Sequence, residues 1–248
     1  MRTFIIIAGL ALISATGLAQ DRFLTKDPPR TILENLKRGN SRFVGNRPSN
    51  LHKDSGRREL SVQREPSLYA LATILSCTDS RVPVELIFDV GVMDVCVHRT
   101  PGNTCTEREA AGIEYDLKRN ATPVIIVMGH SDCNLIEAAL DPKTFDRLPP
   151  NQQELVKPIL PVAERVKQEN PYLKERALSE ICTRENVMES IHTLFRSSPD
   201  ILELSVKNKI LVVGAVYDVK TGRVAWIEHR QVWNLMNSVN DARKNENK

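Results

Sequence analysis

Five residues in two short clusters have side chains suited to metal chemistry. Cys77, Asp79 and Arg81 lie in the sequence Cys-Thr-Asp-Ser-Arg, and His130 and Cys133 lie in Gly-His-Ser-Asp-Cys. Residues two apart on an extended chain point to the same side, so Cys77 and Asp79 can face one point. His130 and Cys133 are three apart, and one helical turn brings such a pair together. Each cluster can therefore supply two ligands to one ion.

The ligand types favour zinc. Two thiolates, an imidazole and a carboxylate form a borderline-soft tetrahedral set, which suits zinc better than magnesium, calcium or manganese. Copper and iron also bind thiolates, so ligand type alone leaves them open. Taken singly, each residue has a structural explanation: a cysteine that ends a strand is usually core, and Asp79 can cap a turn. Because two such clusters are hard to explain as accidents, we expect Cys77, Asp79, His130 and Cys133 to bind Zn²⁺, one ion per subunit.

Arg81 decides whether such a site is structural or catalytic. A closed set of four protein ligands would be structural. Arg81 is two residues from Asp79, close enough for a bidentate pair with its carboxylate, and that pair would leave the fourth zinc position to water. Zinc lowers the pKa of bound water from about 15.7 to roughly 7, which makes hydroxide available near neutral pH. Asp79 could then orient this hydroxide by accepting its hydrogen bond. The other use of Arg81 is as a surface guanidinium after a turn.

Alternating strand and helix patterns are expected to position these clusters. Apolar segments predict buried strands over residues 68–77, 93–98, 124–128 and 210–216, with a hairpin partner at 224–227. Helical spacing predicts helices over residues 27–43, 107–119, 135–140, 175–195 and 200–206. Residues 45–65 and 141–153 are predicted to be loops. The alternation predicts an α/β fold, a mainly parallel sheet flanked by helices with an N-terminal helical arm. Both clusters follow strands, where ligands of such sheets gather.

Composition excludes several classes of protein. The chain has 248 residues, of which 41% are hydrophobic and 26% charged, and its 34 basic and 31 acidic residues give a net charge of +3. These values exclude a largely disordered, collagen-like or coiled-coil chain. The near balance of charge gives no case for a nucleic-acid partner. Without a repeat or a dividing linker, we expect one catalytic domain over residues 20–236 and a mobile tail over 237–248.

Residues 1–19 are predicted to be a signal peptide. Arg2 precedes an apolar run over residues 4–13, and small residues lead to a cleavage site after Ala19. A membrane anchor would need about 20 apolar residues, and the run is too short. We therefore expect a periplasmic protein, with secretion as the second choice, and no membrane association after cleavage. That compartment permits disulfides, and a bond between Cys96 and Cys105 is left open by the sequence.

Together these features resemble the β-class carbonic anhydrases. The Cys-Thr-Asp-Ser-Arg sequence is followed by Val-Pro-Val-Glu, and the His-Ser-Asp-Cys sequence completes the pair. Further resemblance lies in residues 36–43, in Gly102-Asn103 and in residues 214–222, so that it covers about residues 31–233. The resemblance implies a zinc enzyme, a lyase, that interconverts carbon dioxide and bicarbonate. It also implies a homodimer or a dimer of dimers.

The resemblance also implies roles for individual residues. Cys77, His130 and Cys133 would be the fixed ligands, and Asp79 with Arg81 would form a dyad that either opens the site to water or, with the carboxylate on zinc, closes it. The apolar pocket for carbon dioxide would come partly from a neighbouring subunit. On this chain the residues implied for substrate binding are Val82, Phe88 and Gly102.

Three positions depart from the family pattern. Asn134 replaces a common glycine, and Thr100-Pro101 interrupts the pattern after the second strand. Phe43 stands where members with a closed, bicarbonate-binding site have a tryptophan, so we expect an open site. Two other functions are kept: hydrolysis of carbonyl sulfide or carbon disulfide by the same zinc-bound hydroxide, and a non-catalytic zinc-stabilised binding protein.

Overall fold

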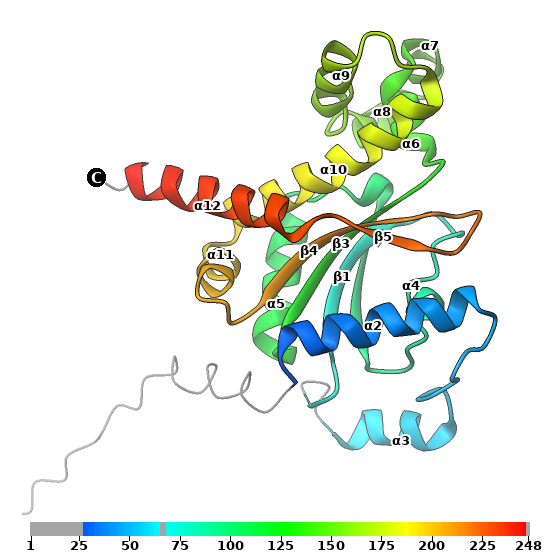
Figure 1. Ribbon diagram of the computed structural model, residues 1–248, viewed down its shortest axis with the longest axis vertical. Coiled ribbons are helices and arrows are strands. Elements are labelled where there is room, and N and C mark those ends of the chain that lie inside the picture. Colours follow the sequence, from blue (N-terminus) through cyan, green and yellow to red (C-terminus); the bar gives the residue numbers. More distant parts are fainter. Residues whose placement is uncertain (1–26, 65–67, 247–248) are drawn as a thin grey trace, which may run out of the picture.

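A five-stranded sheet forms the centre of the molecule (Figure 1). The computed structural model describes residues 27–64 and 68–246. In chain order the strands are β1 (Ala72–Cys77), β2 (Val95–Thr100), β3 (Val124–His130), β4 (Leu211–Tyr217) and β5 (Val224–Trp226). Their order across the sheet is β2-β1-β3-β4-β5, and only β5 runs antiparallel to its neighbour. The predicted α/β fold with a mainly parallel sheet is confirmed. The predicted signal peptide lies outside the described residues.

Helices occupy most of the remaining described chain. They are α2 (Pro29–Val44), α3 (Ser55–Gln63), α4 (Val84–Ile87), α5 (Glu107–Asn120), α6 (Asn134–Leu140), α7 (Pro142–Asp146), α8 (Pro150–Val156), α9 (Leu160–Glu169), α10 (Glu175–Ser197), α11 (Pro199–Val206) and α12 (His229–Glu246). A short 3-10 turn, η2 (Pro101–Asn103), follows β2. The predicted helices are present, with bounds shifted by one or two residues.

Both predicted loops contain helices, so these two predictions were wrong. The segment 45–65 includes α3, which begins after Asp54, whose side chain accepts a hydrogen bond from the Arg57 N–H. The segment 141–153 includes α7 and the start of α8, and Asp141 caps α7. Proline is tolerated in the first turn of a helix, because the missing N–H has no partner there. Prolines that suggested a loop instead mark two helix starts.

Each face of the sheet is covered by a separate set of helices. Successive strand residues point to opposite faces. Leu75 and Ile125 therefore join the apolar cluster formed with α5, α10, α11 and α12. Ile74 and Ile126 join the cluster formed with α2 and α4. All four side chains are fully buried. The carboxyl ends of β1 and β3 are thus held rigidly by a core on both sides.

The predicted N-terminal helical arm is α2, and Asp89 ties it to the chain after α4. Arg42 donates from Nε to the Asp89 carboxylate at 2.6 Å, and the Ser49 N–H donates to it at 2.8 Å. Burial alone would raise the pKa of Asp89, but these hydrogen bonds outweigh burial and lower it to about 2. The α2 backbone comes so close to α4 that a Cβ at Gly39 would lie 1.9 Å from the Phe88 carbonyl oxygen.

The C-terminal segment continues a helix instead of forming the predicted mobile tail. Helix α12 runs to Glu246, and its residues Val232, Met236 and Val239 are buried against the core. Their spacing of three to four residues places them on one face, which binds the helix to the body of the protein. Within residues 27–64 and 68–246, no helix is long and apolar enough to cross a membrane.

Candidate metal centre

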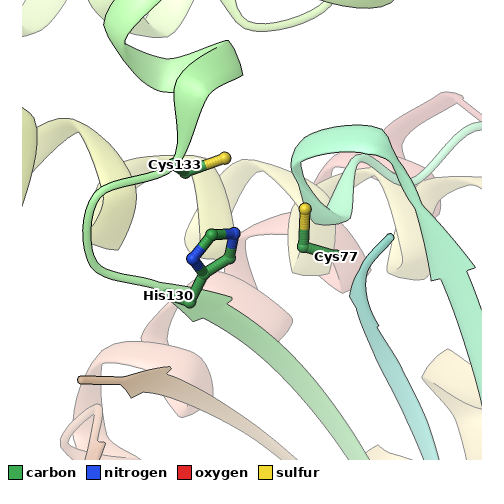
Figure 2. A group of neighbouring side chains, drawn as sticks. All are labelled: Cys77, His130 and Cys133. Atoms are coloured by element: carbon green, nitrogen blue, oxygen red, sulfur yellow. The ribbon is translucent and has the colours of Figure 1, made fainter. Parts of the chain in front are cut away.

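Three predicted ligands meet at one edge of the sheet. Cys77 ends β1, His130 ends β3, and Cys133 caps the start of α6. Because β1 and β3 are adjacent and parallel, their carboxyl ends lie at the same edge. Figure 2 shows the three side chains converging on one point. Their ligand atoms lie within 4.8 Å of one another, and all three residues are buried. Across the described residues, this is the only group of three such side chains close enough to hold an ion.

His130 is oriented as a metal ligand. Its Nδ1 lies 2.9 Å from the Ser131 carbonyl oxygen, which accepts only, so Nδ1 carries the proton and donates. The remaining nitrogen, Nε2, therefore has a free lone pair. It is buried without a hydrogen-bond partner. A buried polar atom without a partner is costly, and metal binding satisfies it. The carbonyl contact to the other ring nitrogen is the usual support of a ligating histidine.

The two cysteine side chains affect each other's pKa. The hydrogen bond from the Cys133 thiol lowers the pKa of Cys77 to about 3, and the same hydrogen bond raises the pKa of Cys133. The Asp79 N–H, 3.5 Å from the Cys77 sulfur, supports the thiolate. Both cysteines lie in an apolar cluster formed by α6, α8 and α9. A thiolate in such surroundings needs a cation, and a metal supplies it in place of the proton.

Asp79 is close to these three ligands but is paired with Arg81. Its carboxylate accepts from Arg81 Nε at 3.0 Å, from an Arg81 Nη at 2.7 Å and from the Arg81 N–H at 2.8 Å. The hydrogen bonds from Arg81 lower the pKa of Asp79 to about 2. Asp79 Oδ2 is 4.0 Å from His130 Nε2. The structure thus groups three of the four predicted ligands and holds the fourth on the Arg81 guanidinium.

The donor set fits zinc. Two sulfurs and one imidazole nitrogen are soft to borderline ligands. Three protein ligands with a fourth position left over is the pattern of catalytic zinc sites, whereas structural sites use four. The buried lone pair of His130 Nε2, which has no hydrogen-bond partner, is the observation that the ion accounts for.

Two of the three residues predicted to bind substrate are buried in the core. Val82 and Phe88 are fully buried, and both pack in the core between the sheet and α2. The structure therefore places them in the interior and not on a surface open to a substrate. Gly102 does lie at the site, where its N–H donates a hydrogen bond to Cys77. Its φ of +66° and a Cβ position only 2.8 Å from Ile159 Cδ1 explain why glycine is needed.

Arg99 is a residue of the site that the sequence did not reveal. It lies on β2 and donates to the carbonyl oxygens of Cys77 and Asp79. The sequence signal was its place at the start of Arg-Thr-Pro-Gly-Asn, the segment after the second predicted strand that partly matches the family pattern, and no role was assigned to it. Cys96 and Cys105, the pair left open for a disulfide, are not joined by a disulfide in the structure.

The sequence of this chain is similar to those of known carbonic anhydrases. The family model described as Carbonic anhydrase matches residues 72–224. Carbonic anhydrase 2 of Mycobacterium tuberculosis is 32% identical over 197 residues, which cover 78% of this chain and 90% of the relative. The carbonic anhydrase of Mycolicibacterium smegmatis is 30% identical over 199 residues, which cover 78% and 91%.

The fold also matches solved structures. The β-carbonic anhydrase CafA of Aspergillus fumigatus superimposes with a TM-score of 0.61 at 21% identity, covering 69% of this chain and 83% of that one. This likeness shows the fold, and the relatives above favour an enzyme over a non-catalytic zinc-stabilised binding protein. The ligands Cys77, His130 and Cys133 all lie within the matched segment. The chain belongs to the β-class carbonic anhydrases and is a zinc enzyme.

Proposed function

We propose that this enzyme catalyses the reversible hydration of carbon dioxide to bicarbonate and a proton at zinc held by Cys77, His130 and Cys133. The observation that carries the proposal is the position of the Asp79 carboxylate, which is held by Arg81 while three other ligands face one point. Zinc, when bound, supplies a Lewis acid that lowers the pKa of water into the neutral range.

Asp79 would orient the attacking water. With a pKa of about 2, its carboxylate is ionised at neutral pH and can only accept a hydrogen bond. Such a weak base does not hold the released proton, so its contribution is the direction of the oxygen lone pair. The new bond forms between the water oxygen and the carbon of carbon dioxide, and the proton leaves to solvent.

Arg81 would hold this carboxylate in place and join the two loops that carry the ligands. The Nη that donates to Asp79 also donates to the Asp132 carbonyl oxygen at 2.8 Å. Asp132 precedes Cys133, so a single guanidinium spans from the chain after β1 to the chain after β3. A planar, permanently charged group suits this double contact better than a lysine would.

The test is stopped-flow hydration of carbon dioxide, followed with a pH indicator, on the zinc-loaded protein. We expect fast hydration that rises with pH through the range near 7 where zinc-bound water ionises. The same protein after removal of zinc by a chelator is the control and should be inactive. Carbonyl sulfide is assayed in parallel, because water activated at the same site could attack its carbon. Hydrolysis of carbonyl sulfide without hydration of carbon dioxide, at full zinc, would refute the proposal.

We also propose a homodimer or a dimer of dimers. Two tetrameric β-carbonic anhydrases of Sordaria macrospora support this state; one matches with a TM-score of 0.58 at 24% identity, covering 64% of this chain and 80% of that one. Strand β2 is an edge strand of the described sheet, and an edge offers its backbone to a partner. Light scattering coupled to gel filtration measures the mass; a monomer at micromolar concentration would contradict the proposal.

Export to the periplasm is proposed from the N-terminal sequence. The basic Arg2, the apolar run and the small residues before Gln20 support it. In a bacterial host, the mature protein should appear in the periplasmic fraction with Gln20 as its first residue. Mass spectrometry of that fraction decides the matter, and an intact N-terminus in the cytoplasm would be the contrary result.

A further inference from the structure

The loop from Cys77 to Arg81 is held from the neighbouring strand by Arg99. Arg99 Nε donates to the Cys77 carbonyl oxygen at 3.0 Å, and an Arg99 Nη donates to the Asp79 carbonyl oxygen at 2.6 Å. The register of β1 and β2 pairs Ser76 with Arg99, which places the guanidinium beside the end of β1. One side chain therefore holds the backbone of a ligand and the backbone of a dyad residue.

Backbone contacts support the same loop. The Thr78 N–H donates to the Thr100 carbonyl oxygen at 3.2 Å, and the Val82 N–H donates to the Asp79 carbonyl oxygen at 3.0 Å. Substitutions leave such main-chain bonds in place. The contacts of Arg99 depend on its side chain, and a rigid guanidinium fork sets the distance between the two carbonyl oxygens that it binds. Removing Arg99 would therefore loosen the backbone at Cys77 and Asp79 while these main-chain bonds remain.

The position of Asp79 matters because its carboxylate has two possible partners. At present Arg81 binds it, and Oδ2 is 4.0 Å from His130 Nε2, the atom that faces the ion. A carboxylate is itself a zinc ligand, so a small shift of the loop would carry it from Arg81 to the metal. The Arg81 side chain is 41% exposed, which weakens its hold through solvent screening. The Arg99 bond to the Asp79 carbonyl oxygen is a second restraint, which acts on the backbone that carries this carboxylate.

We propose that Arg99 is a positioning residue that keeps the Asp79 carboxylate on Arg81 and off the metal. The inference rests on the proposed function only in that the open position is used for hydration. It concerns the coordination of the metal, which can be observed without turnover.

Cobalt substitution provides that observation. Wild-type protein, Arg99→Met and Arg99→Lys are loaded with Co²⁺, and their visible spectra are titrated with azide, which binds an open metal position. Arg176→Met is the matched control, because Arg176 is an exposed arginine of α10 that forms an ion pair with Glu180 one turn away. In Arg99→Met, carboxylate ligation should shift the cobalt bands and raise the azide concentration needed for half-saturation about tenfold or more.

The conservative variant gives a graded result. Lysine retains one donor, so Arg99→Lys should respond to azide between wild type and Arg99→Met. Turnover of the zinc form of Arg99→Met should fall about 10- to 100-fold, as is typical when support of metal ligands is lost. Arg176→Met should match wild type in both measurements.

Two results would overturn the proposal. One is an Arg99→Met spectrum and azide titration equal to those of wild type; should that variant fail to fold, a wild-type response in Arg99→Lys counts the same way. The other is a wild-type cobalt protein that does not bind azide, because no open position would then exist to protect. Failure of the proposed function looks different: wild type would bind azide normally and yet not hydrate carbon dioxide.

Discussion

Replacement of Asp79 by asparagine tests the dyad most directly. The substitution keeps the shape of the side chain but removes the charge that Arg81 binds. Asparagine Oδ1 can still accept from the Arg81 N–H and Nε, but its amide would face the Arg81 Nη that now donates to Oδ2. Two hydrogen-bond donors, the asparagine amide and the Arg81 Nη, would then face each other. The hydrogen bond that now joins this Nη to Oδ2 is therefore lost.

The effect on stability should be small and the effect on turnover large. The Arg81 and Asp79 side chains are 41% and 17% exposed, so solvent screening limits the loss of stability to about 1 kcal/mol. Loss of the orientation of a reacting group by about 1 Å costs about 10²-fold in rate. We expect turnover to fall at least about 100-fold, which corresponds to about 2.7 kcal/mol in the activation barrier.

Three measurements separate the possible causes. Zinc analysis should find one ion per chain, because Cys77, His130 and Cys133 are unchanged. Thermal unfolding should show a small shift, and stopped-flow hydration should show the large loss. Asp132→Asn is the matched control: it removes an exposed negative charge that also acts on Arg81 but lies outside the dyad. Wild-type turnover in Asp79→Asn at full zinc, or an equal loss in Asp132→Asn, would refute the reasoning.

Three further predictions concern the ligands and the fold. Cys133→Ala should abolish zinc binding, because a buried thiolate is lost; metal analysis showing full zinc would contradict the site. Gly39→Ala should destabilise the protein by about 1–3 kcal/mol in urea unfolding, since its Cβ would overlap the Phe88 carbonyl; wild-type stability would refute the α2–α4 contact. The carboxyl of Asp89 has its pKa lowered to about 2 from 3.8, so ionisation there contributes up to about 2 kcal/mol. That stabilisation should be complete above pH 4 and lost as the pH falls towards 2, and Asp89→Asn should remove this part of the acid dependence.

The zinc ligands could be predicted because their residue types and short spacings are visible in the sequence. Cys77 and His130 follow apolar segments that are recognisable as strands, and Cys133 is one turn beyond His130. Parallel strands place their carboxyl ends at one edge, so the two clusters had to meet if the strands were neighbours. The apolar pattern also indicated the α/β class, since buried parallel strands are apolar throughout.

Helix ends and burial were less predictable. Prolines at residues 142 and 150 were read as loop residues, although proline at a helix start costs nothing. The tail after residue 236 is polar in composition, yet Val239 alone continues the buried face of α12. The sequence around Phe88 does not show whether this side chain lines a pocket or lies in the core, because its burial depends on the elements packed around it.

By itself, the sequence determined Cys77, His130 and Cys133 as ligands and indicated the family, because those depend on residue types and short spacings. Only the tertiary structure decided that the Asp79 carboxylate binds Arg81 and that Arg99 binds the backbone carbonyls of Cys77 and Asp79. In the sequence, Arg99 is 22 positions from Cys77 and 20 positions from Asp79. They exist because of the register between β1 and β2, which pairs Ser76 with Arg99 and follows from packing across the whole sheet.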